Sequence, residues 1–498
     1  MKHLSILKNS EKSTEFFALR KVSPRGRFRG ASYLKKILLA LILTVIVQMG
    51  NLKAQEKYEA TWASIDKRPI PEWFSKAKFG IFIHWGLYSV PAWGPLPSDG
   101  ADIYDCYAEW YWSKLLNKGS KVNPLFTEFH RKHYGDDFKY QDFVKDFKCE
   151  MFKPEDWAKL FQEAGARYVV LTSKHHEGFT LWPSEYAWNW NAVDVGPHRD
   201  LAGDLSEAVK KQGLRMGFYY SLYEWYNPLY LKNVDEYVDK HMIPQLKELV
   251  NRYLPDIIWP DGEWDHPSST WKSTEFLSWL YNESPVRETI VVNDRWGKET
   301  RSKHGDFYTT EYDLSNNDNL KDTRIMHPWE ECRGIGHSFG YNRNENLGDY
   351  SSSEQLIHLL IDKVSSGGNL LLNVGPTADG RIPVIMQQRL MDMGAWLKTN
   401  GEAIYETEPW DITVKQQDIN AYFTTKGKDL YVICTKYPDK PITVRNVTRK
   451  PKTVKMLGNK ANIKYSQSGK NITITPASLS PADNPGQYAW VFKIADCL

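Results

Sequence analysis

Two carboxylates follow a short apolar run in the stretch IIWPDGEW, residues 257–264. The run ends at Trp259 and a proline, and Asp261 and Glu263 come directly afterwards. Acidic residues that follow a buried strand can be ordinary solvated turn residues. A carboxylate in this position can also act as a nucleophile, a base or an acid, because the rigid end of a strand holds it in one place. The sequence therefore raises the question of which of the two, if either, does chemistry.

Further side chains with chemical potential occupy corresponding positions along the chain. Each follows an apolar run typical of a buried strand, as in FGIFIHWG, YVVLTSKHHEGF, GFYYSLYEW, IVVNDRWG, DFYTTEYD and SFGYN. If these strands form one parallel barrel, their carboxyl ends meet at one rim, together with the polar groups that follow them. The candidates are His84, Lys174, His175, His176, Tyr219, Tyr220, Asn293, Asp294, Arg295, Glu311 and Phe339.

Each of these residues also has a structural interpretation. A single buried histidine such as His84 is often a hydrogen-bonded core residue, and Arg295 can form an ion pair with the adjacent Asp294. His175 and His176 are neighbours, so on an extended segment they point in opposite directions and make a poor metal site by themselves. Several such groups at successive strand ends are harder to explain structurally than any one of them.

The sequence lacks the motifs of several common chemistries. It has no glycine-rich phosphate-binding loop, no G-x-S-x-G nucleophile motif and no cluster with metal-ligand spacing. Carboxylates, aromatic rings and neutral hydrogen-bonding groups remain. These groups suit the transfer of a glycosyl group to water, which needs one carboxylate as nucleophile or base and one carboxyl group as acid. The aromatic content of 14% is compatible with sugar binding, although large barrels also bury many aromatic residues.

The segments that would position these residues alternate between helix and strand from about residue 70 to residue 400. In the clearest unit a helix begins at Pro154 and ends at Gly165, and an apolar strand follows at 168–171. Its apolar stripe, spaced i, i+3, i+4 and i+7, consists of Trp157, Leu160, Phe161 and Ala164. The pattern recurs at 204–220, 243–259, 274–292 and 354–374. Repeated helix–strand units without an early G-x-G-x-x-G favour a (β/α)8-type barrel over an open doubly wound sheet.

The two ends of the chain differ from this middle part. After about residue 405 the helical periodicity disappears, and short alternating strands separated by turn residues predict a small C-terminal β-sandwich. We therefore expect three parts, which are a basic extension with a secretory signal at 1–54, a catalytic barrel at 55–404 and a sandwich at 405–498.

Residues 1–54 carry 11 Lys or Arg against two Glu, a net charge of +9. The apolar segment at 37–47 is too short for a membrane-spanning helix, which needs about 20 residues. With a basic flank before it and Ala54 after it, this segment predicts a secretory signal and an exported, periplasmic or secreted protein with no stable membrane insertion after cleavage. An uncleaved anchor is the alternative.

The net charge limits the classes of binding partner, and the cysteine pattern indicates the state of the thiols. Without residues 1–54 the formal charge changes from +3 to −6, which argues against nucleic acid as a partner. The five cysteines are scattered and show no zinc spacing, so we expect mostly buried thiols, with room for one disulfide. The sequence does not indicate an oligomeric state.

Long motifs in this chain resemble the α-L-fucosidases of glycoside hydrolase family 29. They are WFSKAKFGIFIHWGLYSVPAW, YAEWY, GARYVVLTSKHHEGF, DLAGDL, GFYYS, VVNDRWG, RGIGHSFGYN and GGNLLLNVGP, and they follow the family's order from about residue 57 to residue 410. The resemblance implies a barrel followed by a β-sandwich, in agreement with the periodicity. It also implies a fucosylated glycan as substrate, with no cofactor and no metal.

The resemblance assigns roles to the two carboxylates of a retaining mechanism. Asp261, two residues after the strand-end Trp259, matches the family's nucleophile, and Glu263 is then a loop residue. Glu311, in the stretch TTEY, matches the general acid/base of one branch of the family. Other branches take this carboxyl group from another position, so three rivals remain open, namely Asp313, Glu330 and Glu331. A retaining pair should lie about 5–5.5 Å apart.

The remaining motif residues are implied to bind the sugar. His84, Glu109, Trp110, His175 and His176 would bind ring hydroxyls, Tyr219 and Arg295 would lie near the nucleophile, and Trp259 and Phe339 would pack against the C5-methyl group of fucose. Two other functions stay open at this point, a retaining glycosidase for a different sugar and a non-catalytic carbohydrate-binding barrel.

Overall fold

The structure is a computed structural model that describes residues 57–312, 327–410 and 421–498. The predicted secretory signal and Asp313 lie outside the described residues. Tyr58–Leu498 form one compact unit. Among the described residues, no helix combines the length and the apolar content that crossing a membrane requires. All five cysteine thiols are free and buried, as expected for most of them.

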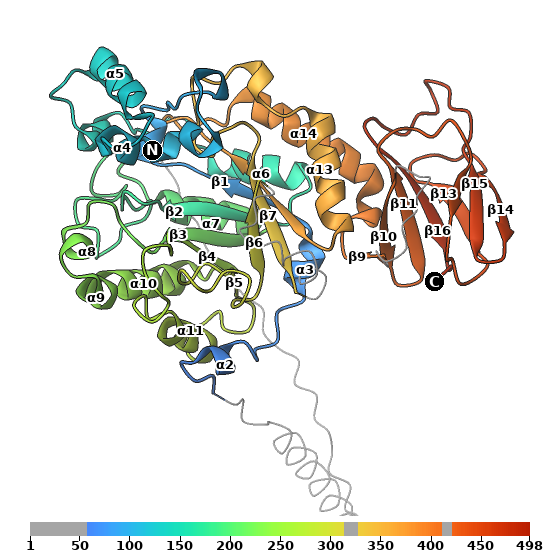
Figure 1. The fold of residues 1–498 in the computed structure, drawn as a ribbon, viewed down its shortest axis with the longest axis horizontal. Helices are drawn as coiled ribbons and strands as arrows, with labels where there is room; N and C mark the ends of the chain where they lie inside the picture. Colours follow the sequence, from blue (N-terminus) through green and yellow to red (C-terminus); the bar gives the residue numbers. More distant parts are fainter. Residues whose placement is uncertain (1–56, 313–326, 411–420) are drawn as a thin grey trace, which may run out of the picture. The chain divides into compact units, whose positions relative to one another are not determined.

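Eight parallel strands form one curled sheet with the order β5-β4-β3-β2-β1-β8-β7-β6 (Figure 1). Its edge strands β5 and β6 lie next to each other, because the backbone N–H of Asp306, just before β6, donates to the carbonyl of Val292 in β5 at 2.9 Å. This arrangement confirms the predicted (β/α)8-type barrel. The strands are β1 (Phe79–Ile83), β2 (Tyr168–Lys174), β3 (Arg215–Ser221), β4 (Ile257–Asp261), β5 (Val291–Val292), β6 (Tyr308–Glu311), β7 (Trp329–Gly334) and β8 (Asn369–Val374).

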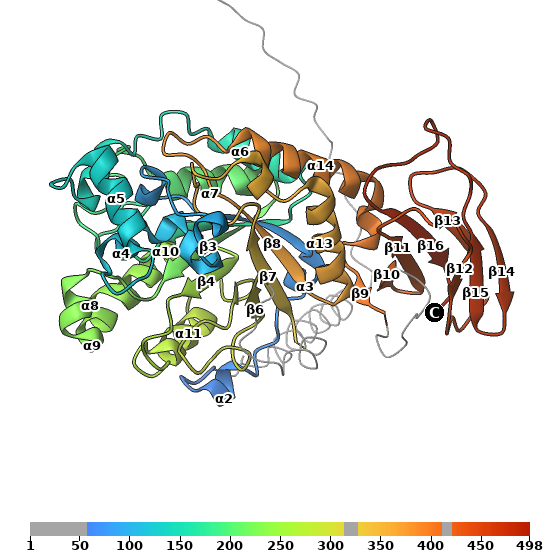
Figure 2. The same cartoon turned by 45° about the horizontal axis from the view of Figure 1, so that its top comes forward.

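Helices connect the strands and surround them (Figures 1 and 2). The predicted unit at 154–171 is a helix α6 that begins at Pro154, followed by Gly165 at φ 87° and then β2. Trp157 and Phe161 of its stripe are buried. The helices are α2 (Trp62–Ile65), α3 (Trp73–Ala77), α4 (Tyr111–Leu116), α5 (Asn123–Tyr134), α6 (Pro154–Glu163), α7 (Leu201–Lys211), α8 (Pro228–Lys232), α9 (Val234–Tyr237), α10 (Ile243–Tyr253), α11 (Ser273–Asn282), α13 (Ser353–Ser365) and α14 (Val384–Asn400).

The period of two along each strand decides which side chains enter the barrel. In β4, Ile258 belongs to the large cluster that packs against the helices, whereas Ile257 and Trp259 belong to a smaller cluster with Phe82 of β1 and Tyr219 of β3. This smaller cluster fills the inside of the barrel. The alternation therefore turns the side chain two residues after Trp259 towards the barrel axis, at the carboxyl end of the strand.

Two antiparallel sheets follow the barrel (Figure 1). Their orders are β13-β16-β11-β10-β9 and β12-β15-β14, and a separate apolar cluster includes buried side chains from both. These sheets confirm the predicted C-terminal β-sandwich. The strands are β9 (Glu408–Pro409), β10 (Ala421–Lys426), β11 (Asp429–Cys434), β12 (Ile442–Val444), β13 (Thr453–Met456), β14 (Lys464–Ser468), β15 (Asn471–Thr475) and β16 (Trp490–Ala495).

Candidate active site

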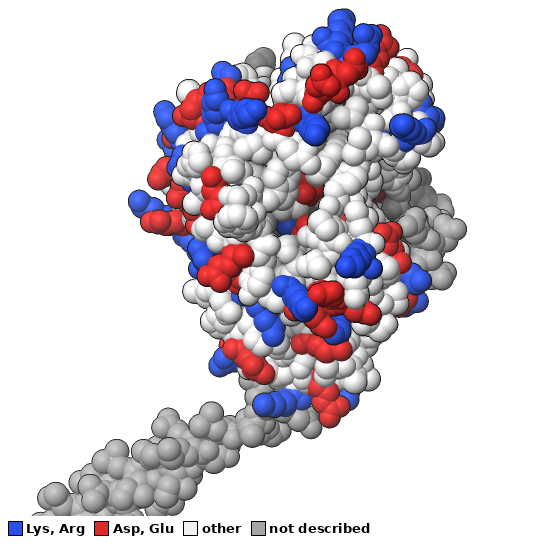
Figure 3. Space-filling view, turned by 90° about the vertical axis from the view of Figure 1, so that its left-hand side faces the viewer, with Lys and Arg blue, Asp and Glu red and all other residues white. Residues whose placement is uncertain are grey.

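A cavity of about 350 Å³ opens at the carboxyl ends of the barrel strands. Figure 3 faces this end of the barrel and shows a hollow whose surrounding wall is mostly uncharged. All eleven residues predicted to act on the sugar line the cavity, namely His84, Glu109, Trp110, His175, His176, Tyr219, Trp259, Asp261, Arg295, Glu311 and Phe339. They come from seven strands or the segments that follow them and from the β1–β2 connection, so the fold brings together residues far apart in sequence.

Asp261 ends β4 and is held by two donors. Its Oδ1 accepts a hydrogen bond from Arg295 NH1 at 2.7 Å, and its Oδ2 accepts one from the Tyr219 hydroxyl at 2.9 Å. Burial by itself would raise the pKa of Asp261, but the positive charges of Arg295 and Arg301 outweigh it and lower that pKa below its usual value. The carboxylate is therefore ionised at neutral pH and fixed in direction.

Glu311 ends β6 on the other side of the same guanidinium. Its Oε1 accepts a hydrogen bond from the Tyr107 hydroxyl at 2.8 Å, and its Oε2 lies 3.4 Å from Arg295 NH2. Its side chain is 20% exposed, against 10% for Asp261. Glu311 is thus the more accessible of the two carboxyl groups.

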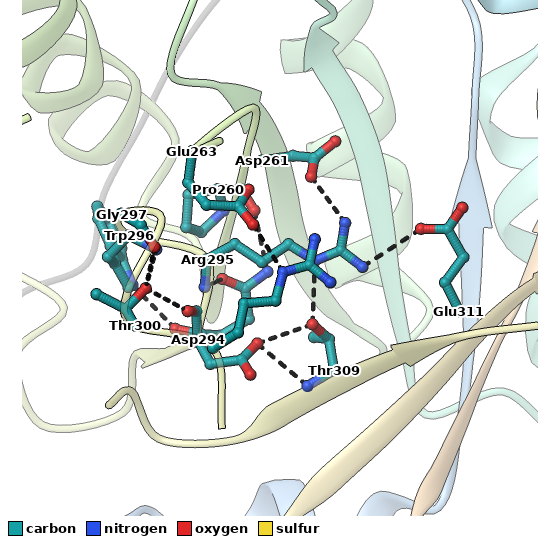
Figure 4. A network of polar contacts seen from close by, with 12 residues as sticks. Pro260, Asp261, Glu263, Asp294, Arg295, Trp296, Gly297, Thr300, Thr309 and Glu311 are labelled. Carbon is teal, nitrogen blue, oxygen red and sulfur yellow. Dashed lines mark hydrogen bonds and ion pairs between the residues drawn. The ribbon is translucent and has the colours of Figure 1, made fainter. Parts of the chain in front are cut away.

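Arg295 joins the two carboxyl groups (Figure 4). Its NH1 and NH2 reach Asp261 and Glu311, while its Nε donates to Thr309 Oγ1 at 3.0 Å. The guanidinium carbon also lies 4.4 Å from the ring centre of Trp259, a cation–π distance. The alternative pairing with Asp294 does not occur, because both Asp294 oxygens accept hydrogen bonds from other donors.

Two of the histidines are neutral and have one defined tautomer. His84 Nδ1 lies 2.7 Å from Asn373 Oδ1, and His176 Nδ1 lies 2.7 Å from the Ser221 hydroxyl, which itself donates to a backbone carbonyl. Both Nδ1 atoms must therefore donate, which leaves an acceptor lone pair on each Nε2. The Nε2 of His176 lies 3.5 Å from the Tyr219 hydroxyl, which donates its proton to Asp261 instead. Burial, followed by the charge of His175, lowers the pKa of His84 to about 3 and that of His176 well below its usual value. Each ring can accept a hydrogen bond from a hydroxyl group.

His175 and Glu109 occupy the closed part of the cavity. His175 is 4% exposed, and its Nδ1 lies 3.4 Å from Glu177 Oε2. Glu109 is 2% exposed, and its Oε2 accepts from the Gly340 N–H at 2.8 Å and the Ser338 hydroxyl at 3.1 Å. The two hydrogen bonds hold the Glu109 carboxyl group in place where water is largely excluded.

Aromatic rings form one wall beside these polar groups. Phe339 lies 4.8 Å from the His84 ring centre, and Phe82 lies 5.0 Å from that of Trp259. The ring centre of Trp110 lies 5.2 Å from that of His176. The cavity therefore pairs an apolar wall with hydrogen-bonding groups, which suits a ligand with one apolar and several polar faces.

The rival carboxylates point elsewhere. Glu330 lies inside the barrel below the cavity, where its Oε1 accepts from Trp259 Nε1 at 3.0 Å and its Oε2 accepts from the Tyr168 hydroxyl. Glu331 accepts from Thr310 and Arg333 and is fully buried. Neither lines the cavity.

Glu263 and the other strand-end candidates also have structural partners. Glu263 is 1% exposed and pairs with Arg301 Nε at 2.6 Å. Lys174 forms a buried ion pair with Glu224 at 2.7 Å, and the Tyr220 hydroxyl donates to Gln245. Asn293 donates to the Pro260 carbonyl at 3.0 Å. The structure separates these residues from the cavity, as the structural interpretations allowed.

Glu330 gives a testable effect of pH on stability. Burial raises the pKa of Glu330 from 4.5 to about 7. Between pH 4.5 and pH 7 the folded protein therefore keeps a proton on Glu330 that the unfolded chain has lost. This contribution favours folding at low pH and disappears as the pH rises through 7. We expect the stability of the wild type relative to Glu330→Gln to fall by about 2 kcal/mol between pH 5 and pH 8. Urea unfolding at both pH values measures it, and a constant difference would contradict a buried, proton-binding Glu330.

Seven lining residues were not predicted. Two had a signal in the sequence, since Phe82 shares the strand face of His84 and Tyr107 stands in the YAEWY motif two residues before Glu109. Arg301 comes from the connection between β5 and β6, which has no regular pattern. The seven are Phe82, Tyr104, Tyr107, Lys114, Trp264, Arg301 and Cys332.

Comparison with known proteins agrees with this arrangement. The sequence profile of the family named alpha-L-fucosidase matches residues 45–402, and that of the alpha-L-fucosidase C-terminal domain matches residues 415–495. The tissue α-L-fucosidase of Homo sapiens is 43% identical over 468 residues, which cover 92% of this chain and 96% of that protein.

Solved structures show the same relationship. The α-fucosidase of Thermotoga maritima in complex with a mechanism-based inhibitor has a TM-score of 0.74 at 39% identity, covering 88% of this chain and 99% of that one. Its complex with fucose has a TM-score of 0.72 at 37% identity, covering 88% and 100%. From its sequence, its fold and these matches, the chain belongs to the α-L-fucosidases of glycoside hydrolase family 29.

Proposed function

We propose that the chain releases L-fucose from the ends of fucosylated glycans with retention of configuration, through a covalent fucosyl-enzyme. One observation carries the proposal, which is that Arg295 holds Asp261 and Glu311 from opposite sides at the rim of one cavity. A retaining glycosidase needs two carboxyl groups in this relation, one to attack and one to transfer a proton. A fucosylated glycan fits the cavity because its sugar combines hydroxyl groups with an apolar methyl group.

In the first step Asp261 attacks the anomeric carbon, and Glu311 gives its proton to the leaving oxygen. The C–O bond to the leaving group breaks as the bond to the aspartate forms. Tyr219 and Arg295 hold the two carboxylate oxygens, so the nucleophile loses little motion when it reacts.

In the second step Glu311 accepts a proton from water, and the water oxygen attacks the anomeric carbon. The ester to Asp261 breaks, and L-fucose leaves with its original α configuration. Arg295 contacts both carboxyl groups throughout, which stabilises the negative charge on whichever group carries it.

Recognition of the sugar follows from the two kinds of wall. The Nε2 lone pairs of His84 and His176 would accept hydrogen bonds from ring hydroxyls, with His175, Glu109 and Trp110 completing the polar side. Trp259 and Phe339 would pack against the C5-methyl group. A sugar with a hydroxyl group there would bury it without a partner, at a cost of roughly 1–3 kcal/mol.

Trapping of the intermediate tests the proposal directly. We expect 2-deoxy-2-fluoro-α-L-fucosyl fluoride to inactivate the enzyme and to leave a fluorofucosyl group on Asp261. The fluorine at C2 slows both steps, but the good fluoride leaving group keeps the first step fast enough for the intermediate to accumulate. Fragmentation of the labelled peptide must separate Asp261 from Glu263, because the two lie in the same peptide. A label on Glu263 or Glu311 would refute the assignment of the nucleophile. Aryl β-galactoside, which we expect to be inert, is the control for sugar specificity.

The N-terminal segment completes the proposal. We infer export of the protein from its basic flank, its short apolar segment and Ala54, and we keep the divisions at 54/55 and 404/405 as predictions. Sequencing the N-terminus of the mature protein from its host would test the first division, with a start near residue 55 expected.

A further inference from the structure

The exposure of the cavity walls shows which end receives the leaving group. The closed end is lined by His84, Glu109 and Phe339, which are 5%, 2% and 4% exposed. The open end is lined by Tyr104 and Trp264, which are 48% and 41% exposed. Fucose, the terminal sugar, fits the closed end, so the group to which it is linked must lie at the open end.

Arg301 lines the cavity with Tyr104 and Trp264, and only its Nε is bound within the described part of the protein. Its Nε donates to Glu263 at 2.6 Å, and its side chain is 26% exposed. In the part of the chain that the structure describes, Glu263 is its only hydrogen-bond partner, so both terminal NH2 groups remain available. Arg301 lines the same cavity as Tyr104 and Asp261, and its positive charge contributes to the lowered pKa of Asp261.

The lysine of the cavity wall, Lys114, differs from Arg301 in its donor geometry. Lys114 Nζ binds Asp105 at 2.9 Å, and Asp105 also pairs with Lys121 at 3.0 Å. Lys114 therefore shares one carboxylate with a second cation, and its single nitrogen offers no planar pair of donors. A guanidinium held through Nε, by contrast, presents its two NH2 groups as a planar fork that matches the two oxygens of a carboxylate or a sulfate.

We propose that Arg301 binds an anionic group on the leaving sugar, so that this enzyme acts on fucosylated glycans that carry a carboxylate or a sulfate next to the fucose. The inference rests on the proposed function and names its substrate class. Tyr104 and Trp264 would pack against the faces of the leaving sugar, while Glu263 holds the guanidinium in place.

Three aryl fucosides test the proposal. They are 4-nitrophenyl α-L-fucosides that carry a carboxylate, a sulfonate or a carboxamide at position 3 of the nitrophenyl ring. We expect kcat/KM for the carboxylate or the sulfonate to exceed that for the carboxamide at least about tenfold at low salt. A carboxylate withdraws electron density less strongly than a carboxamide, so the carboxylate-bearing phenolate is the poorer leaving group. Faster cleavage of the carboxylate substrate must therefore come from binding by the enzyme. Preference for the carboxylate points to acidic sugars and preference for the sulfonate to sulfated ones, and both support the proposal.

The ratio of anionic to neutral substrate is the readout for the variants, because the charge of Arg301 also acts on Asp261 and its loss will affect every substrate. We expect Arg301→Gln to bring the ratio to about one and Arg301→Lys to give an intermediate value. Arg381→Gln is the matched control, since Arg381 pairs with Asp379 outside this cavity and its loss should keep the wild-type ratio. Salt should lower the wild-type ratio through screening.

The outcomes separate this inference from the proposed function. A wild type that cleaves all three substrates without preference, or a folded Arg301→Gln with the wild-type ratio, overturns the role of Arg301 alone. A wild type that cleaves none of them overturns the proposed function as well. If Arg301→Gln fails to fold, the ratio in Arg301→Lys and the salt dependence of the wild type decide.

Discussion

Replacement of Asp261 by alanine should lower kcat/KM for aryl α-L-fucosides by at least about a thousandfold, because the reaction loses the group that forms the covalent bond. The loss should be similar for good and poor leaving groups. Steady-state assays with a series of aryl fucosides measure it. A variant that keeps more than about a tenth of the wild-type activity would rule Asp261 out as the nucleophile.

Added azide makes the result specific. In Asp261→Ala, azide can enter the space of the lost carboxylate and attack the anomeric carbon directly, so the product should be the inverted β-fucosyl azide. Removal of one partner of Arg295, whose side chain is 2% exposed, also costs stability, so Asp261→Asn and a thermal unfolding curve control for folding. Asp265→Ala is a matched control in the same loop, since Asp265 binds Tyr230 and does not line the cavity.

Replacement of Glu311 by alanine should affect substrates according to their leaving groups. Poor leaving groups need a proton as they depart, so we expect their kcat/KM to fall about a hundredfold or more, whereas strongly activated aryl fucosides should lose far less. Azide needs no general base, so it should restore turnover and give the retained α-fucosyl azide. The opposite stereochemistry of the two azide products distinguishes the acid/base from the nucleophile within one pair of variants.

The rivals of Glu311 provide the controls for this experiment. Glu330→Gln and Glu331→Ala should show neither a dependence on the leaving group nor rescue by azide, because neither side chain lines the cavity. Asp313, outside the described residues, is tested in the same way. Rescue by azide in one of these variants, and its absence in Glu311→Ala, would move the acid/base role to that residue.

The sequence predicted the barrel and most of the cavity because both follow short-range rules. A helix with one apolar stripe, a glycine stop and a buried strand recur along the chain, and parallel strands gather their carboxyl ends at one rim. Asp261 could be located in this way because it shares the strand face of Trp259. The resemblance then selected it over Glu263, whose carboxylate turns to Arg301.

What remained unpredicted depends on contacts between distant segments. Arg301 and Tyr104 come from connections without regular periodicity, so nothing local indicates that they line the same cavity. The sequence left open whether Arg295 forms an ion pair with Asp261 or with Asp294. The structure shows the pair with Asp261, while Asp294 accepts a hydrogen bond from Thr309. The direction of Glu330 depends on where β7 begins, since a shift of one residue would exchange it with Glu331.

Arg295 has one further consequence. Its guanidinium is held by Thr309 and by the face of Trp259, so it stays in place when the charges of the two acids change. If Asp261 and Glu311 act as proposed, the negative charge passes from Asp261 to Glu311 in the first step and returns in the second. The Arg295 guanidinium lies between the two groups and does not need to move. In open water, the solvent dipoles would have to reorient as the charge moves. Here one fixed cation takes their place, so the surroundings rearrange little while the bonds change.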